Sequence, residues 1–228
     1  PVPYGADTTG ELFDGSALLL QRLPGVNLAE AHLYGAEAAD VERQMARQVA
    51  ALHEQSRETY GSALKPADEG NQRWVEVFEP RMRSEYEAAA PKLSPQARRE
   101  ALDVINHLED WLPESGRPTL VHGDLWATNI IVNPDGHEGP HVTGYVDGGA
   151  EYTDREYELA YLLVFNMAGQ AFFREYQKYH ELRDGFELRC RVYWLNTMLL
   201  HVRAFGDQHY IRNSEALANQ LANSRPQG

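Results

Sequence analysis

Length, composition and charge already argue against several classes of protein. The chain has 228 residues and a formal net charge of −13, and 43% of its residues are hydrophobic. A nucleic-acid partner is disfavoured because neutralising phosphates requires a basic surface. No stretch approaches the roughly 18 consecutive apolar residues of a membrane-spanning helix, and the start lacks the basic-then-apolar pattern of a secretion signal. We therefore expect a cytoplasmic globular module without nucleic-acid or membrane partners, whose oligomeric state has no signature in the sequence.

The chain begins with a segment of few predicted elements. An apolar run at residues 17–20 predicts one strand, and Pro24-Gly25 shortly after it is a turn signal. We therefore expect a single strand and a turn before the first helix.

Three helices are predicted in the first half of the chain, at residues 36–55, 71–89 and 94–113. In the first of them Val41, Met45 and Val49 recur at four-residue steps, which places them on one face of a helix. The third opens with Ser94-Pro95, a capping residue followed by proline in the first turn, which is a typical helix start.

Short apolar runs in the middle of the chain predict strands. They lie at residues 119–121, 130–132 and 142–146, and the residues 133–136, Asn-Pro-Asp-Gly, are a strong turn signal between the last two. A small hairpin of this kind would carry residues 122–129 as a loop between strands.

The last third of the chain is predicted to be helical, at residues 155–167, 170–180, 184–205 and 214–223. The expected fold class is therefore α+β, a helical body around a short hairpin. Cys190, the only cysteine, is interpreted as a small buried side chain, because no histidine stands near it in sequence to serve as its base. His53 is interpreted as a core residue with a satisfied polar contact.

The predicted loop carries the most informative residues of the chain. Residues 122–129 read His-Gly-Asp-Leu-Trp-Ala-Thr-Asn, and Asp147 follows the third predicted strand. Phosphoryl transfer needs a carboxylate that orients the nucleophilic hydroxyl, and it needs oxygen ligands for the Mg²⁺ that bridges the phosphates. Asp124 suits the first role, and Asn129 and Asp147 suit the second. Each residue alone has an ordinary structural interpretation, whereas the combination favours a phosphotransfer site.

This combination resembles the aminoglycoside phosphotransferase branch of the protein-kinase-like fold. Leu125-Trp126 after His-Gly-Asp, the segment 147–160 and the stretch 193–210 are most similar to the fructosamine (ketosamine) kinases. The resemblance implies the helical C-terminal lobe of a kinase-like protein, with ATP and Mg²⁺ as cofactors. It also implies transfer of the γ-phosphate to a sugar hydroxyl of a small-molecule or protein-bound ketosamine.

The chain departs from kinases of this fold at its N-terminal end. Gly5, Gly10 and Gly15 are dispersed and form no glycine-rich loop, and no lysine precedes Lys65. By the resemblance, residues 1–28 are expected to be a remnant of the N-terminal lobe, comprising its last strands and the hinge, and residues 29–228 the catalytic lobe. The chain, which begins without methionine, is expected to be a fragment or a product that starts inside the small lobe.

In the resemblance, the hinge corresponds to Gln21, Arg22 and Leu23, whose backbone would hydrogen-bond the adenine. A further departure is Glu158, where the family usually has aspartate before its Leu-Ala pair. The charge is kept, so a structural role is expected to survive.

Three further residues are candidates for substrate binding or loop support. His122 is interpreted as a brace of the loop through its ring hydrogen bonds, because Asp124 already fills the role of base. Trp126 could support the loop by packing or could line the acceptor pocket, where an aromatic face suits a sugar or an amine. Asp154 is interpreted mainly as a helix cap, with shaping of the acceptor site as a secondary role.

Two alternatives to the ketosamine kinase remain open at the level of sequence. The same catalytic residues would serve an aminoglycoside, choline-like or homoserine-like acceptor. The missing lysine and glycine-rich loop would also fit a catalytically silent kinase-like module that binds a ligand or partner.

Overall fold

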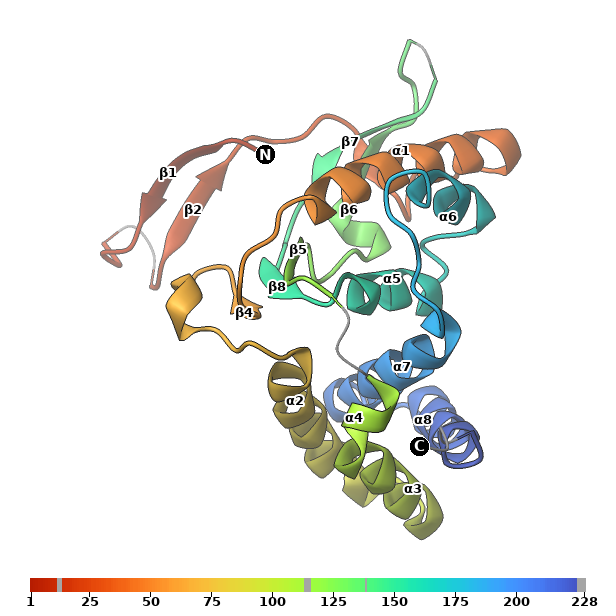
Figure 1. The fold of residues 1–228 in the computed structure, drawn as a ribbon. Helices are drawn as coiled ribbons and strands as arrows, with labels where there is room; N and C mark the ends of the chain where they lie inside the picture. The colour runs from red at the N-terminus through yellow and green to blue at the C-terminus, as the bar shows by residue number, and fades with distance from the viewer. Residues whose placement is uncertain (12–13, 113–115, 138, 225–228) are drawn as a thin grey trace.

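A computed structural model of the chain describes residues 1–11, 14–112, 116–137 and 139–224. A helical body surrounds small antiparallel sheets (Figure 1). The helices are α1 (Gly35–His53), α2 (Trp74–Ala89), α3 (Pro95–Asn106), α4 (Leu108–Trp111), α5 (Arg155–Val164), α6 (Gln170–Tyr176), α7 (Phe186–Ala204) and α8 (Gln208–Ala222). The strands are β1 (Pro3–Asp7), β2 (Ala17–Leu20), β3 (Val26–Asn27), β4 (Gly61–Ser62), β5 (Thr119–Val121), β6 (Ile130–Asn133), β7 (His141–Tyr145) and β8 (Glu151–Thr153). The predicted α+β class, a helical body with a short hairpin at the loop, is confirmed.

The two strands that flank residues 122–129 belong to different sheets. β6 and β7 form the predicted hairpin, with Ile130 opposite Tyr145, and β3 joins it at the other edge of β6. β5 instead pairs with β8, a strand that the sequence did not predict. The short 3-10 turn Ala127–Asn129 redirects the chain between β5 and β6, so the loop spans two sheets.

The N-terminal strands form a hairpin that projects from the helical body (Figure 1). The strand β2 was predicted, whereas β1 was not, because its sequence Pro-Tyr-Gly-Ala-Asp lacks the alternation of apolar residues that signals a strand. Residues 3–7 are in the strand conformation because they pair with β2, and not because of a pattern in their own sequence. Apolar side chains remain uncovered here, and Leu19 is 66% exposed.

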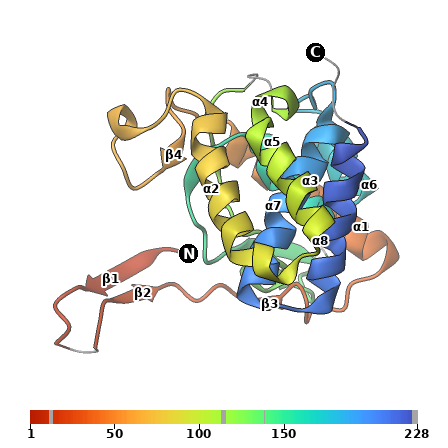
Figure 2. The same cartoon turned by 90° about the horizontal axis from the view of Figure 1, so that it is seen from below.

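The core has two parts, each built mainly by helices. One part lies between α2, α3, α7 and α8, which lie side by side in Figure 2. The other lies between α1, α5, α6 and the β6–β7 hairpin and contains Val41, Met45 and Val49. Cys190 is buried in the first part, and burial raises the pKa of its thiol to about 12, which agrees with the predicted structural role.

Helix ends deviate from prediction where the backbone changes locally. The third predicted helix opens as expected, with the Ser94 hydroxyl accepting from the Ala97 amide, but His107 interrupts it and separates α3 from α4. Its predicted end, residue 113, lies outside the described residues. The helix α5 stops at Val164 because Asn166 adopts a left-handed conformation, and Met167 N–H bonds back to the Leu162 carbonyl.

Among the described residues, we find no helix that combines the length and the apolar character needed to cross a membrane.

Candidate active site

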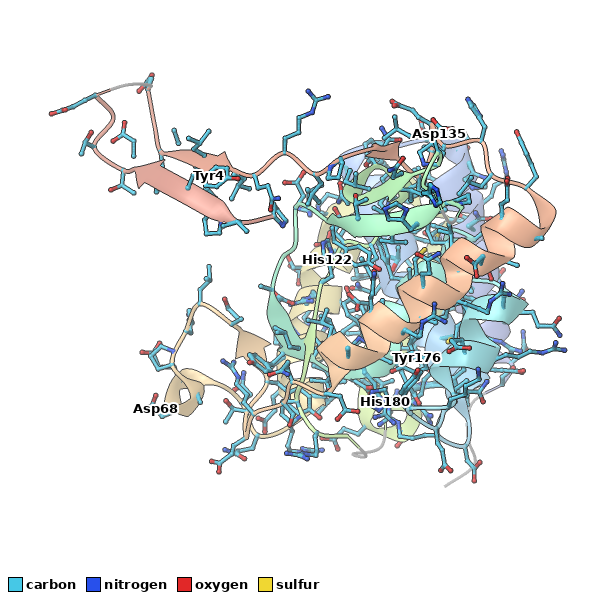
Figure 3. All side chains as sticks on the ribbon, turned by 90° about the horizontal axis from the view of Figure 1, so that it is seen from above. Tyr4, Asp68, His122, Asp135, Tyr176 and His180 are labelled. Carbon is cyan, nitrogen blue, oxygen red and sulfur yellow. The ribbon has the colours of Figure 1, made fainter. Side chains whose placement is uncertain are left out.

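The loop after β5 is fixed at its first turn by the core. Gly123, with a φ of 84°, turns the chain, and its N–H donates to Oε1 of the buried Glu158 at 2.7 Å. The other carboxylate oxygen of Glu158 lies 3.0 Å from Nε2 of His53, whose Nδ1 contacts the Tyr176 hydroxyl. Tyr176 lies beside α1 in Figure 3. The expected structural role of the residue before Leu-Ala is therefore present, and His53 is a satisfied core residue as predicted.

His122 supports the same turn. Its Nδ1 accepts from the Asp124 N–H at 3.3 Å, and its carbonyl accepts from the Gly149 N–H at 2.7 Å. Its ring also meets the Tyr145 ring edge-on. These contacts tie the loop to β7 and to the chain beyond it, and they are compatible with the bracing role predicted for His122.

Asp124 and Asn129 lie in direct contact. The Asn129 amide nitrogen donates to the Asp124 carbonyl at 3.0 Å and to carboxylate Oδ2 at 2.9 Å. Because the nitrogen is committed to Asp124, the remaining polar atom of this amide is Oδ1, an oxygen of the kind Mg²⁺ prefers. The donor set therefore fits a Mg²⁺ ion.

The other carboxylate oxygen of Asp124 is held by a residue that the sequence did not reveal. The Tyr161 hydroxyl donates to Oδ1 at 2.6 Å, a length typical of a hydrogen bond to a charged oxygen. Burial and this hydrogen bond both raise the pKa of Tyr161, which keeps the phenol protonated as a donor. The available signal was the helical spacing, since Tyr161 stands three positions after Glu158 and both side chains reach the loop from α5.

Asp147 follows β7, and a backbone hydrogen bond of the residue before it connects this segment to the loop. The preceding Val146 N–H donates to the Asn129 carbonyl at 3.0 Å. Asp147 itself has a φ of 56°, an uncommon left-handed conformation for a residue other than glycine. The structure thus brings the predicted base, Asp124, and the two predicted metal ligands, Asn129 and Asp147, to one end of the β6–β7 hairpin.

The predicted hinge segment lies against the same hairpin. A Cβ at Gly144 would come within 2.8 Å of Leu23 Cδ1, so the Leu23 side chain lies directly against this position of β7. The Gln21 N–H is already bonded to the Val2 carbonyl at 2.7 Å, and Arg22 is exposed. Of the three predicted nucleotide-binding residues, Leu23 lies against the hairpin.

Asp154 is a helix cap that also belongs to a buried group of ion pairs. Its carboxylate accepts from the Glu156 N–H at 3.0 Å, as predicted for a cap, and pairs with Arg183 at 2.6 Å. Arg183 and Arg189 both pair with Glu156. We call these four side chains the ion network. The network anchors the start of α5, and through α5 it positions Glu158 and Tyr161.

Trp126 is 40% exposed and lies at the edge of the loop. Its ring meets the Phe165 ring edge-on at 5.4 Å between centroids. It also lines a largely apolar cavity of about 420 Å³ together with Leu28, Met45 and Met167. Both roles predicted for this residue, packing support and a pocket wall, are compatible with this position.

Solved structures share this fold. The aminoglycoside phosphotransferase APH(4)-Ia superposes on this chain with a TM-score of 0.67 at 17% identity. The superposition covers 100% of this chain and 78% of that protein. A candidate fructosamine-3-kinase from Thermobifida fusca superposes with a TM-score of 0.69 at 24% identity, over 92% of this chain and 71% of its own. The chain therefore has the kinase-like fold that aminoglycoside phosphotransferases share.

Sequence comparison identifies the branch. The family model described as "Fructosamine kinase" matches residues 28–223, so this chain belongs to the fructosamine kinase family, as the resemblance predicted. The Escherichia coli K12 protein named "Probable ketoamine kinase YniA" is 30% identical over 188 residues, which cover 78% of this chain and 63% of that protein. Mouse ketosamine-3-kinase is 29% identical over 149 residues, 63% of this chain and 45% of that protein. The chain thus spans less than two thirds of the length of these relatives.

Proposed function

We propose that this chain carries the catalytic lobe of an ATP-dependent kinase that phosphorylates a sugar hydroxyl of a small-molecule or protein-bound ketosamine. The observation that carries the proposal is the environment of Asp124. Both of its carboxylate oxygens accept from neutral donors, Tyr161 and Asn129, and no Arg or Lys pairs with it among the described residues. Its negative charge is oriented but not neutralised, which is what a proton acceptor requires.

In the proposed reaction, Asp124 orients the acceptor hydroxyl and takes its proton. The acceptor oxygen forms a bond to the γ-phosphorus of ATP, the bond from that phosphorus to the bridging oxygen breaks, and ADP leaves. Asn129 and Asp147 would hold Mg²⁺, which neutralises phosphate charge when bound. The protein contributes mainly by positioning these groups.

We assign the nucleotide to the side of the β6–β7 hairpin on which residues 21–23 lie. A variant of APH(4)-Ia, 16% identical to this chain, is described as a ternary complex with ADP and hygromycin B, which supports a nucleotide site in this fold. In this proposal residues 1–28 belong to a nucleotide-binding lobe, and residues 29–228 form the catalytic lobe.

The proposal is tested by phosphate transfer from Mg-ATP to fructosyl-lysine, detected by mass spectrometry, with kanamycin and choline as parallel acceptors. We expect transfer to fructosyl-lysine, reduced by about 10²- to 10⁴-fold in Asp124→Asn because the proton acceptor is lost. Asp135→Asn is the matched control, since Asp135 lies in the turn between β6 and β7, and should keep full activity. Transfer to kanamycin or choline alone, or equal transfer by Asp124→Asn, would contradict the proposal.

A further inference from the structure

A row of aromatic rings begins at the candidate catalytic residue and runs along the ends of α5 and α7. The Tyr161 ring lies 4.9 Å from the Phe165 ring, which lies 5.2 Å from the His201 ring. His201 in turn lies 4.8 Å from Tyr210 and 5.5 Å from Phe205. We call these five residues the aromatic wall.

The wall is connected to Asp124 and open to solvent. Tyr161 donates to Asp124, and Trp126, two residues after Asp124, packs on Phe165. Within the wall Phe205 is 64% exposed and the other four residues are partly exposed, and the neighbouring Trp126 is 40% exposed. A ligand lying on the wall would therefore have one end at the Asp124 carboxylate.

His201 gives the wall one hydrogen-bonding atom, Nε2, whose role follows from the contact of the other ring nitrogen. Its Nδ1 lies 2.8 Å from the Thr197 carbonyl, which can only accept, so Nδ1 carries the proton. In the neutral ring Nε2 is then a hydrogen-bond acceptor, and it has no partner among the described residues. A hydrogen-bond acceptor surrounded by aromatic rings suits a ligand that has a hydrogen-bond donor and, next to it, an apolar or cationic group.

The charges around the wall favour a cation. Aromatic faces attract ammonium groups, and the Asp124 carboxylate lies at one end of the wall. At the other end Asp207, which directly follows Phe205-Gly206, is exposed. Two nearby basic side chains are engaged elsewhere, since Arg203 pairs with Glu85 and Lys92 donates to the Val202 carbonyl.

We propose that the aromatic wall is the acceptor-binding surface and selects a sugar that carries a protonated amine. The amine lies on the rings and donates to His201 Nε2, and this contact delivers the sugar hydroxyl to Asp124. The inference rests on the proposed function and deepens it, because it names which side chains distinguish a ketosamine from a plain sugar.

Direct binding tests the inference without relying on turnover. Isothermal titration of the 228-residue chain with fructosyl-lysine, with fructose and with lysine should show the tightest binding for fructosyl-lysine. His201→Phe keeps a ring but removes the acceptor, so we expect its Kd for fructosyl-lysine to rise about tenfold, as for the loss of one hydrogen bond, with little change for fructose.

His107→Phe is the matched control. Its Nδ1 also lies 2.8 Å from the carbonyl four residues earlier, that of Asp103, but it stands between α3 and α4, away from the wall. We expect its Kd to equal that of the unmodified chain. If circular dichroism shows that His201→Phe folds poorly, Phe205→Ala is used in its place, because removing this exposed side chain leaves no cavity. We expect Phe205→Ala to weaken the binding of fructosyl-lysine severalfold.

The outcomes separate this inference from the proposed function. Selective binding that depends on His201 or Phe205 supports the inference even where no phosphate is transferred, and that result would count against the kinase alone. Phosphate transfer with unchanged Kd in both variants would overturn the inference and leave the kinase standing. Failure of the unmodified chain to bind fructosyl-lysine would also overturn it.

Discussion

The catalytic loop and the ion network hold carboxylates in opposite ways. In the ion network Asp154 and Glu156 are buried and face the guanidinium groups of Arg183 and Arg189. In the loop the Asp124 carboxylate accepts from an amide and a phenol. The first arrangement neutralises charge and fixes the start of α5. The second orients a charge and leaves it available for chemistry.

In the ion network, burial and charge act on the pKa of Glu156 in opposite directions. Burial alone would raise the pKa of Glu156, but hydrogen bonds from Arg183 and Arg189 outweigh it and lower that pKa. Glu156 and Asp154 in turn raise the pKa of Arg183 against its own burial. Glu156 is thus held ionised by two guanidinium groups, whereas the Asp124 carboxylate is oriented by two neutral donors.

The largest expected effect is the loss of a partner in the ion network. Glu156→Ala removes this partner from the buried Arg189 and the partly buried Arg183, so we expect the free energy of unfolding to fall by about 3–5 kcal/mol. Urea denaturation followed by circular dichroism measures it. A change below about 1 kcal/mol would mean that the network behaves like a surface pair.

The pH dependence of stability should sharpen the same contrast. The pKa of Glu156 is lower in the folded chain than in the unfolded one, so its contribution is present above the unfolded value of about 4.3 and is lost as the pH falls through the folded value. We expect the Tm of the unmodified chain to fall between about pH 5 and pH 3 more steeply than that of Glu156→Gln. Parallel Tm curves would show that Glu156 is not the group responsible.

A smaller effect is expected at the loop, and it should fall on rate rather than on stability. Tyr161→Phe removes the donor to Asp124 Oδ1, so we expect kcat for fructosyl-lysine to fall about tenfold with little change in the KM for ATP. Tyr86→Phe is the control, because its hydroxyl donates to the Arg98 carbonyl outside the site. Equal losses in the two variants would refute a positioning role for Tyr161.

The smallest effect is expected at an exposed ion pair. Arg73 and Glu109 lie 2.9 Å apart with side chains 41% and 66% exposed. Glu109→Ala should lower the free energy of unfolding by less than about 1 kcal/mol, because solvent screens both charges. The same denaturation experiment measures it, and a loss as large as that of Glu156→Ala would remove burial as the explanation of the difference.

Much of the fold was predictable because its signals are local. The apolar faces of α1 and α2, the Ser94 cap and the turn of the β6–β7 hairpin all lie within a few consecutive turns of chain. The resemblance likewise rested on residues 122–129, a contiguous motif. Local patterns of this kind can be read from the sequence because the residues that interact are already neighbours along the chain.

The parts that the sequence could not predict depend on residues far apart in the chain. Glu156 and Arg183 are 27 positions apart, and Asp124 and Tyr161 are 37 apart. The pairing of β5 with β8 has the same origin, since neither short strand carries a pattern that specifies its partner. The roles of Asp124, Asn129 and Asp147 remain predictions, which the structure supports by bringing their backbones together.

The left-handed backbone at Asp147 has a consequence for saturation mutagenesis of this position. Glycine and asparagine tolerate such a φ, whereas valine and isoleucine do not. Glycine should therefore pass a screen for soluble expression and fail a screen for turnover, while the branched residues should fail both. Asparagine keeps an oxygen without the charge and should fall between them. The two screens together would separate, at this one position, what the backbone conformation requires from what the reaction requires.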